Sequence, residues 1–251
     1  IALILFNLEV VMFETQHLQN TTLLCHPDYK DELTQQWFDA SYWQQQEKIV
    51  GAKKGRATAW FFKHQQLTGV LRHYWRGGLV GKLLSDQYLY FGLKQTRVYK
   101  EFTLMMRLRE LGLNVPTPIG AKIKTSGFIY RGDIITEAVT GAKSVLDILI
   151  TRPLSQSELK AIAATLSDFH NHGVYHADLN INNILFDDTG KVFIIDFDRG
   201  EIKKPHPSWQ TENIKRLARS FAKEQGRNEQ MHWRQSDWQS LICDYQALLK
   251  T

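Results

Sequence analysis

The stretch from residue 176 to residue 196 limits what this chain can fold into more than any other part of the sequence. Asp178 and Asn183 stand five positions apart, just before a short apolar run, and Asp196 directly follows a second apolar run. Residues 187–190, between the two runs, read Asp-Asp-Thr-Gly and predict a hairpin turn. The sequence therefore predicts a small two-stranded hairpin with a polar loop before it and a carboxylate at its end.

The order and spacing of these polar residues resemble the catalytic loop of the protein-kinase-like superfamily, and the resemblance implies phosphoryl transfer. The reaction needs a carboxylate that orients an attacking hydroxyl and accepts its proton, and it needs hard oxygen ligands that hold Mg²⁺ on the phosphates. We predict that Asp178 is the catalytic base, that Asn183 and Asp196 are the metal ligands, and that His176 braces the loop. Any one of these residues alone is more often a turn or capping residue, but their joint spacing favours the catalytic interpretation.

The same residues resemble two motifs of the protein-kinase-like superfamily. An H-x-D sequence with an asparagine five residues after the aspartate resembles the kinase catalytic loop, and Asp196-Phe197-Asp198 resembles its metal-binding D-F-G motif. The resemblance implies ATP and Mg²⁺ as cofactors. It also implies an α+β fold of two lobes, the first rich in strands with one long helix and the second mostly helical.

The apolar pattern and the turn signals along the chain agree with that order. Three short strands, with a turn at Thr68-Gly69, are predicted between Gln45 and Tyr74, and a helix is predicted from Thr96 to Leu111. A capping box that begins at Ser155 opens another helix. The other predicted elements are strands at Ile119–Lys124, Phe128–Glu137, Asn183–Phe186 and Val192–Ile195, and helices at Thr211–Lys223 and Ser236–Leu249.

We expect three segments in the chain. Residues 1–35 are an N-terminal extension of uncertain structure, residues 36–138 form the strand-rich lobe, and residues 139–251 form the helical lobe. The apolar run from Ile1 to Phe6 is too short to span a bilayer, and it lacks the basic flank and cleavage site of a signal peptide. The residues before Met12 are expected to be either an upstream extension or a buried first strand.

Two segments upstream of the predicted catalytic loop are candidates for nucleotide binding. Gly51 and Gly55 lie between two predicted strands, in a segment that resembles a kinase glycine-rich loop, where missing side chains let backbone amides approach phosphate oxygens. A plain hairpin turn is the alternative explanation. Residues 138–142 are expected to offer backbone contacts to adenine, and Glu137, just before them, is included among the cofactor-binding residues.

The cation that would hold the phosphates departs from the kinase pattern. Val70-Leu71-Arg72 stands where a V-A-I-K sequence is expected on the third strand, so Arg72 is the predicted phosphate ligand and Lys63 is the alternative. Glu101, on the predicted long helix, is the expected partner of that cation, although an exposed helical glutamate is a simpler explanation. The sequence leaves the choice between the two cations open.

Charge and cysteine content narrow the possible partners. The net charge is +5, and no Asp or Glu occurs from Lys48 to Ser85, so this stretch should carry a positive field. Such a field attracts nucleotide phosphates, anionic lipid head groups or nucleic acid, or it belongs to a solvated basic face. Nucleic-acid binding does not explain the carboxylates, and we expect no nucleic-acid partner. Cys25 and Cys243 suggest neither a disulfide nor a zinc site.

Several features argue against a protein substrate. Asn180 stands where Ser/Thr protein kinases usually carry lysine, no A-P-E motif follows, and the segment from Asp198 to Thr211 leaves little room for a regulated activation loop. These features are similar to those of small-molecule and sugar kinases. Six segments look like the Kdo kinase family of lipopolysaccharide core kinases, where Kdo is 3-deoxy-D-manno-octulosonic acid. They are Trp60-Phe61-Phe62, Leu71 to Leu79, Thr96-Arg97, Val115 to Pro118, Tyr175 to Asn180 and Ile195 to Gly200.

The resemblance to the Kdo kinase family implies a substrate and a location. It implies transfer of the ATP γ-phosphate to the 4-hydroxyl of Kdo on a lipid A precursor, by a peripheral protein at the cytoplasmic face of a Gram-negative inner membrane. Because Kdo carboxylates and lipid A phosphates are anionic, Arg76 and Arg199, with Asp198 beside the metal site, are candidate acceptor-binding residues. A heptose kinase and a pseudokinase that serves as a binding module are the alternatives, and no obligate protein partner is inferred.

A second cationic region is predicted near the C-terminal helices. It comprises Lys203, Lys204, Lys215, Arg216 and Arg219, with Trp209 nearby. Such a region suits an anionic membrane surface, where each added charge contributes about 1 kcal/mol. A solvated helix face explains Lys215 and Arg219 equally well, so they are left out of the predicted catalytic site.

Overall fold

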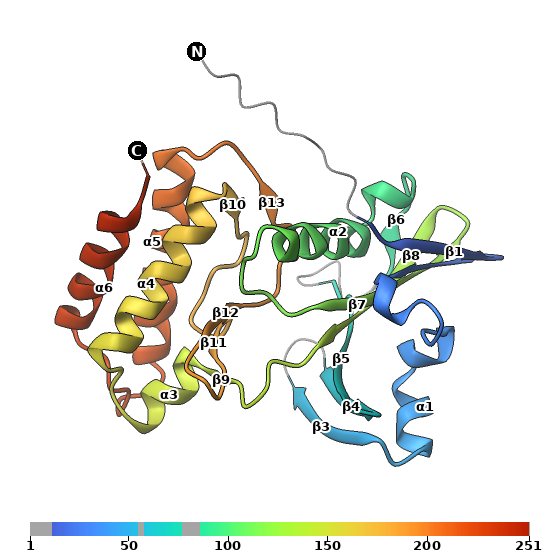
Figure 1. Ribbon diagram of the computed structural model, residues 1–251, viewed down its shortest axis with the longest axis horizontal. Helices are drawn as coiled ribbons and strands as arrows, with labels where there is room; N and C mark the ends of the chain where they lie inside the picture. Colours follow the sequence, from blue (N-terminus) through green and yellow to red (C-terminus); the bar gives the residue numbers. More distant parts are fainter. Residues whose placement is uncertain (1–11, 55–57, 77–85, 251) are drawn as a thin grey trace.

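The computed structural model describes residues 12–54, 58–76 and 86–250, which form two lobes (Figure 1). The first lobe is an antiparallel sheet in the order β1-β2-β7-β8-β5-β4-β3, with β6 paired to β8 and the long helix α2 packed against β7 and β8. Its elements are β1 (Glu14–Leu18), β2 (Thr21–Cys25), α1 (Ala40–Gln45), β3 (Ile49–Lys54), β4 (Thr58–His64), β5 (Leu67–His73), β6 (Tyr88–Leu89), α2 (Arg97–Glu110), β7 (Pro118–Ser126) and β8 (Ile129–Glu137).

The second lobe is mostly helical, and α4 packs along α6 (Figure 1). Its elements are β9 (Lys143–Ser144), α3 (Val145–Thr151), α4 (Gln156–Asn171), β10 (Val174–Tyr175), β11 (Ile184–Phe186), β12 (Val192–Ile194), β13 (Glu201–Ile202), α5 (Pro207–Gln225) and α6 (Gln235–Leu248). The Ser155 hydroxyl accepts from the Glu158 amide while the Glu158 carboxylate accepts from the Ser155 amide, so the predicted capping box is confirmed. The predicted α+β class, with a strand-rich first lobe and a helical second lobe, is confirmed as well.

The hairpin of β4 and β5 differs from the prediction at its turn. The turn lies at Gln65 and Gln66, with Gln65 at φ 52, so the predicted turn at Thr68-Gly69 is wrong. Gly69 lies inside β5, opposite Phe62, and a Cβ there would come within 2.3 Å of the Phe62 ring. The glycine is a packing requirement of the sheet, which a sequence cannot distinguish from a turn signal.

The helix α2 forms as its sequence predicts. The Thr96 hydroxyl caps it by accepting from the Tyr99 amide at 3.3 Å, and Val98, Phe102 and Met105 are buried on one face. That face packs on the sheet, and its far end reaches the helical lobe. The helix is therefore placed to carry side chains to the junction of the two lobes.

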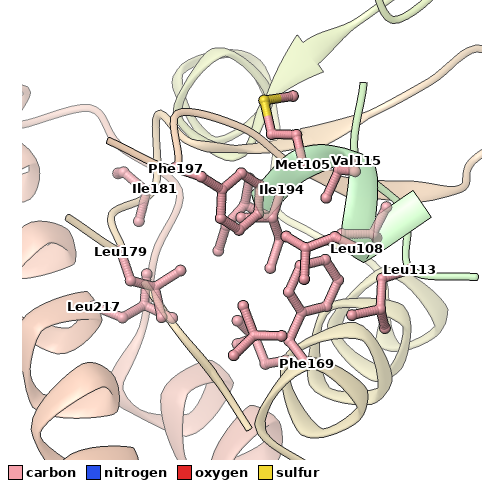
Figure 2. Close-up of a cluster of buried hydrophobic side chains, with 14 of the residues drawn as sticks. Met105, Leu108, Leu113, Val115, Phe169, Leu179, Ile181, Ile194, Phe197 and Leu217 are labelled. Carbon is pink, nitrogen blue, oxygen red and sulfur yellow. The ribbon is translucent and has the colours of Figure 1, made fainter. Parts of the chain in front are cut away.

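A single buried cluster joins the lobes behind the predicted catalytic loop (Figure 2). Met105 and Leu108 of α2 belong to it together with residues of the helical lobe, among them Phe169 of α4 and Phe197. The Phe197 ring stacks on Phe169 at a centroid distance of 6.0 Å and lies 4.9 Å from the His176 ring. This packing fixes both ends of the predicted catalytic stretch on one core.

The N-terminal segment contributes strands to the first lobe. β2 pairs with β7 over its whole length and β1 pairs with β2, within the segment for which no element was predicted. The expectations for Ile1 to Phe6 and for the residues before Met12, and the position of Gly55, lie outside the described residues. The predicted lobe boundary near residue 138 stays a prediction, and β8 ends at Glu137 just before it. Among the described residues, no helix has the length and apolar character to cross a bilayer.

Candidate active site

His176 holds the loop that carries the predicted base. Its Nε2 lies 2.9 Å from the Ile195 carbonyl oxygen, which can only accept, so Nε2 is the donor and Nδ1 accepts from the Asp178 amide at 3.2 Å. Burial lowers the pKa of His176 below its ordinary value, which suits this neutral tautomer. The side chain is buried, so the predicted role as a brace agrees with its position.

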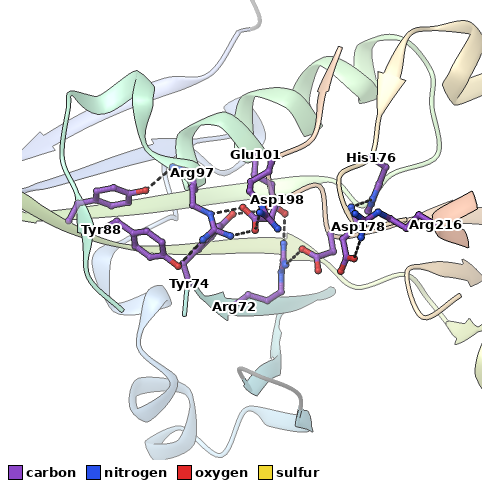
Figure 3. Close-up of polar contacts among 12 residues, drawn as sticks. Arg72, Tyr74, Tyr88, Arg97, Glu101, His176, Asp178, Asp198 and Arg216 are labelled. Atoms are coloured by element: carbon purple, nitrogen blue, oxygen red, sulfur yellow. Dashed lines mark hydrogen bonds and ion pairs between the residues drawn. The ribbon is translucent and has the colours of Figure 1, made fainter. Parts of the chain in front are cut away.

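The backbone of Asp178 is held by two asparagines, and its carboxylate is left open. Asn180 and Asn183 donate through Nδ2 to the Asp178 carbonyl oxygen at 2.8 and 3.0 Å. The Asp178 side chain is 45% exposed, and its Oδ1 lies 3.4 Å from Nη1 of Arg216 on α5 (Figure 3). The carboxylate is therefore oriented but accessible, as a base for an incoming hydroxyl must be.

Asp196 lies at the end of β12 in a left-handed backbone conformation, with φ 66. Its Oδ1 accepts from Nη1 of Arg72 at 2.9 Å. Burial acts to raise the pKa of Asp196, but Arg72 holds that pKa below its ordinary value, so the carboxylate is ionised near neutral pH. The Ile195 amide donates to the Asn183 carbonyl at 3.0 Å, which places Asn183 next to the residue before Asp196.

These two residues fit a Mg²⁺ site. Asn183 uses its Nδ2 to reach the Asp178 carbonyl, which leaves its amide oxygen for another partner, and Asp196 is an ionised carboxylate. Mg²⁺ takes one or two protein oxygens and completes its shell with water and substrate phosphates. Among the described residues, no cluster of three His, Cys, Asp or Glu suited to a metal occurs.

Arg72 joins the two lobes at the centre of the site. One guanidinium nitrogen donates to Asp196, and the other donates to Glu101 of α2, which also accepts from the Tyr74 hydroxyl (Figure 3). Burial raises the pKa of Glu101, and the charge of Arg72 opposes that rise. Burial acts to lower the pKa of Arg72, but Glu101 and Asp196 hold it above its ordinary value, so the cation persists. Lys63 is exposed on β4, and the structure brings Arg72 to these carboxylates.

Asp198 is bound by Arg97, a residue that the sequence analysis quoted but did not assign to the site. Nε of Arg97 donates to Asp198 at 2.8 Å and Nη2 donates to its second oxygen, so the pair is bidentate (Figure 3). Nη1 of Arg97 also donates to the Tyr88 hydroxyl at 3.0 Å. Burial acts to lower the pKa of Arg97, but Asp198 holds it above its ordinary value. Asp198 therefore anchors the segment after the metal site to α2.

The two predicted acceptor arginines lie beside this pair. The Arg76 guanidinium lies 4.9 Å from the Tyr88 ring centroid, and its Nε is buried without a hydrogen-bond partner among the described residues. Arg199 has φ 60 and a side chain that is 70% exposed, 3.8 Å from Asp198. Arg76 and Arg199 both line the cavity, where a guanidinium can bind an anion.

One cavity of about 820 Å³ brings most of these side chains together. Its lining comprises Thr58, Ala59, Arg72, His73, Tyr74, Trp75, Arg76, Tyr88, Arg97, Asp178, Asp196, Asp198 and Arg199. Gly51 lies within β3 and does not line the cavity, and Glu137 turns its side chain to accept from the Tyr29 hydroxyl at 2.7 Å. Glu137 lines a separate cavity of about 270 Å³.

Sequence reasoning assigned Arg216 to a cationic surface, whereas the structure places it against the predicted base. Arg216 is separated from Asp178 by 38 positions, and no local pattern in the sequence links them. Arg97 gave a weak signal, because the Thr96-Arg97 pair belongs to the segments that resemble the Kdo kinase family. Its role is visible only once α2 is packed beside Asp198.

Comparison with known proteins finds relatives that share one name. The 3-deoxy-D-manno-octulosonic acid kinase of Vibrio parahaemolyticus serotype O3:K6 is 43% identical over 208 residues, 83% of this chain and 87% of that protein. The kinase of the same name from Vibrio cholerae serotype O1 is 45% identical over 183 residues, 73% of this chain and 77% of its own. That of Photobacterium profundum is 39% identical over 227 residues and covers 90% of this chain and 95% of its own.

A family model gives the same result. The model described as the lipopolysaccharide kinase (Kdo/WaaP) family matches residues 40–245, which include all of the cavity described above. The predicted resemblance is confirmed, and the chain belongs to the lipopolysaccharide kinase (Kdo/WaaP) family.

Proposed function

We propose that this chain transfers the γ-phosphate of ATP to the 4-hydroxyl of a Kdo sugar on a lipid A precursor. Membership of a kinase family makes it a phosphotransferase that acts on a hydroxyl group and uses ATP. The observation that carries the proposal is the large cavity, in which Asp178, Asp196 and the Arg72 guanidinium meet side by side with a cluster of further arginines. The names of the relatives supply the sugar, and the arginines suit its charge.

In this proposal Asp178 receives the proton of the attacking hydroxyl. Its backbone is fixed by Asn180 and Asn183, so the carboxylate meets the acceptor in one orientation. Arg216 lies 3.4 Å from the carboxylate and is proposed to orient it toward the acceptor. Both effects act on the acceptor, so Asp178 is not expected to contribute to nucleotide binding.

The nucleotide is proposed to bind between the lobes. Arg72 is positioned to donate to phosphate oxygens and is itself held by Glu101, while Asn183 and Asp196 would hold Mg²⁺. Mg²⁺ bound there would neutralise negative charge on the phosphates. Gly51 and Gly55 remain proposed backbone contacts to the phosphates, and Glu137 and the connector after it remain proposed contacts at the adenine end.

The acceptor is proposed to lie against Arg76 and Arg199. A Kdo carboxylate matches a guanidinium because two parallel hydrogen bonds can form between the planar groups. Asp198 supports this surface indirectly, since it holds Arg97 across the floor of the cavity. We place the reaction at the cytoplasmic face of the inner membrane, because the proposed acceptor is a lipid, and we propose no nucleic-acid partner and no obligate protein partner.

The test is transfer of radiolabelled phosphate from ATP, with Mg²⁺, to a Kdo-lipid A precursor, to a heptosylated acceptor and to a generic protein. We expect label on the Kdo lipid alone. Asp196→Ala should abolish it, and Asp178→Ala should abolish it while ATP binding, measured by calorimetry, persists. Asp168→Ala is the matched control, because Asp168 is an exposed aspartate of α4 that does not line the cavity.

Other results would redirect the proposal. Label on the heptosylated acceptor alone would identify a heptose kinase. ATP binding without label on any acceptor would favour a pseudokinase. Loss of ATP binding in a folded Asp178→Ala protein would remove Asp178 from the role of base, since a base that acts on the acceptor is not needed to hold the nucleotide.

A further inference from the structure

Three large apolar side chains are exposed together at one end of the strand-rich sheet. Leu89 is 58% exposed, Phe91 is 77% exposed and Phe128 is 88% exposed, and we call these three residues the apolar tip. Leu89 pairs with Ile129, the residue after Phe128, and the Tyr90 amide donates to the Phe128 carbonyl at 2.9 Å. Figure 1 shows β6 and the turn between β7 and β8 at the end of the first lobe that faces away from the helical lobe.

The backbone dictates that these side chains face outward. The Tyr88 and Tyr90 rings contact the Tyr130 ring, at centroid distances of 5.3 and 6.3 Å. Side chains alternate along a strand, so Leu89 of β6 points the other way, and Phe91, after the strand, is exposed as well. Because every member of the apolar tip is more than half exposed, the fold gains little from its apolar character.

Within the described part of the chain, unpaired lysines lie in the two segments that carry the apolar tip, and Arg131 there pairs with Asp86. The segments 87–100 and 118–132 contain no Asp or Glu. Lys94 and Lys124 are exposed, and neither has an acidic partner among the described residues. The rim of the apolar tip is therefore positively charged, while the tip itself is a projection rather than a groove.

We propose that the apolar tip inserts into the head-group region of an anionic lipid bilayer, with Lys94 and Lys124 contacting the lipid phosphates. Exposed aromatic side chains beside unpaired lysines match such a surface, in which rings enter the interface and ammonium groups stay at the phosphates. The inference rests on the proposed function, because a lipid-linked acceptor requires the active site to work at a membrane.

The position of β6 relates the apolar tip to catalysis. Tyr88 lines the large cavity, its hydroxyl accepts from Nη1 of Arg97, and Leu89 is the next residue. Docking of the tip would therefore bring the cavity to the surface that contains the acceptor. The second cationic region suits this task less well, because Lys203 and Lys215 pair with Glu201 and Glu212 and Arg216 pairs with Asp178.

The first experiment measures binding of the full chain to phosphatidylethanolamine vesicles that contain phosphatidylglycerol, by cosedimentation and without substrate. Phe91→Ser/Phe128→Ser should bind at least about tenfold more weakly than the wild type, because two rings leave the interface. Ile150→Ser is the matched control, since Ile150 is an exposed apolar residue of α3 in the helical lobe, and its binding should not change. Equal binding by wild type and double variant, or no binding by the wild type, would overturn the proposal.

The charge of the rim is tested separately. Lys94→Gln and Lys124→Gln should each weaken binding to the phosphatidylglycerol vesicles about fivefold, and added salt should remove the difference. Binding to phosphatidylcholine vesicles should be insensitive to these two changes. If Lys94→Gln and Lys124→Gln bound the anionic vesicles as tightly as the wild type, a role for the two lysines would be contradicted.

Insertion is reported by a fluorophore. Cys243→Ser/Phe128→Cys leaves Cys25, which is buried, as the other thiol, so an environment-sensitive dye can be attached at position 128. Its emission should shift to the blue on addition of anionic vesicles. A blue shift that instead follows protein concentration without lipid would show that a second copy of the chain covers the tip, and it would overturn the lipid assignment.

Activity distinguishes this inference from the proposed function. Phe91→Ser/Phe128→Ser should phosphorylate a deacylated, water-soluble Kdo acceptor at the wild-type rate and a vesicle-embedded Kdo lipid about tenfold more slowly. Failure of the wild type on both acceptors would refute the proposed function, yet the vesicle-binding result would still stand. Equal loss on both acceptors would show that the tip acts on the fold or the cavity and not on the membrane.

Discussion

We expect Arg216 to serve catalysis without contributing measurably to stability. Its ion pair with Asp178 joins two side chains that are each about half exposed, and such pairs contribute about 0 to 1 kcal/mol to folding. We predict that Arg216→Ala leaves the melting temperature unchanged and lowers kcat about ten- to hundredfold, because Asp178 loses its orientation. The KM for ATP should hardly change. Steady-state kinetics with varied ATP and varied acceptor measure the two effects separately.

Two further variants make the Arg216 experiment specific. Arg216→Lys keeps a cation near Asp178 and should recover part of the kcat. Arg227→Ala removes an exposed arginine that pairs with Glu224 near the end of the same helix, and it should leave kcat unchanged. If Arg216→Ala and Arg227→Ala lowered kcat equally, the loss of positive charge near α5, and not the contact with Asp178, would be the cause.

Unlike Arg216, Arg72 is expected to contribute to stability, because its partner, Glu101, is buried. Arg72→Leu leaves the Glu101 carboxylate buried without its cation, which we expect to cost about 3 to 5 kcal/mol of unfolding free energy, measured by chemical denaturation. Arg72→Leu/Glu101→Leu should recover most of that stability but no activity.

Lys63→Ala, on the exposed side of β4, should change stability by no more than about 0.5 kcal/mol and leave the KM for ATP intact. A raised KM for ATP in Lys63→Ala would instead favour Lys63 as the phosphate ligand.

At the scale of elements, the β4–β5 hairpin provides a test of the corrected turn. Gly69→Ala would place a Cβ within 2.3 Å of the Phe62 ring, and we expect a loss of about 1 to 3 kcal/mol in the free energy of unfolding. Gln65→Gly should be neutral or stabilising, because Gln65 has φ 52, a conformation that glycine adopts without strain. If the turn lay at Thr68-Gly69 instead, Gln65→Gly would lower the free energy of unfolding.

The elements that the sequence predicted are those with short-range signals. The capping box at Ser155, the hairpin turn after Phe186 and the apolar spacing of α2 each depend on residues within about four positions of one another. The strands β1 and β2 were not predicted, since their short segments show no clear alternation, and β7, with which β2 pairs, lies about a hundred positions away in the chain.

The residues of the candidate site were likewise predictable only where they lie close together in the sequence. Asp178, Asn183 and Asp196 are close in sequence, so their spacing was informative and the structure gathers them around one loop. The Arg97–Asp198 pair spans 101 positions and the Tyr29–Glu137 contact spans 108, so only the packed fold reveals them. The position of Glu137 in the sequence said nothing about the direction of its side chain.

For the molecule as a whole, we expect stability to depend on pH through His170. This residue connects three helices, because its Nδ1 lies 2.5 Å from the Tyr245 hydroxyl on α6 and its carbonyl accepts from Gln210 of α5. Burial lowers the pKa of His170 from 6.5 to about 4. The unfolded chain therefore binds more protons between pH 4 and 6.5, so this stabilisation is complete above about pH 6.5 and is lost as the pH falls to about 4.

The size of that effect can be measured against a variant. The shift corresponds to at most about 3 kcal/mol, at 1.36 kcal/mol for each pKa unit. His170→Gln should be less stable than the wild type at pH 7.5, and the difference should shrink at pH 4.5, as followed by urea denaturation. A difference that stays constant between the two pH values would show that His170 contributes packing but no proton linkage.

The burial of Phe197 has a consequence for the design of inhibitors. In many protein kinases the phenylalanine of this motif determines whether the site is active, and a ligand can occupy the space that the ring vacates. Here the ring is fully buried between Phe169 and His176, and the next residue is tied to α2 through Arg97. Displacing it would break that ion pair and open the core that joins the lobes. Compounds that need a displaced phenylalanine should therefore bind poorly, and selectivity is better sought among the arginines that line the cavity.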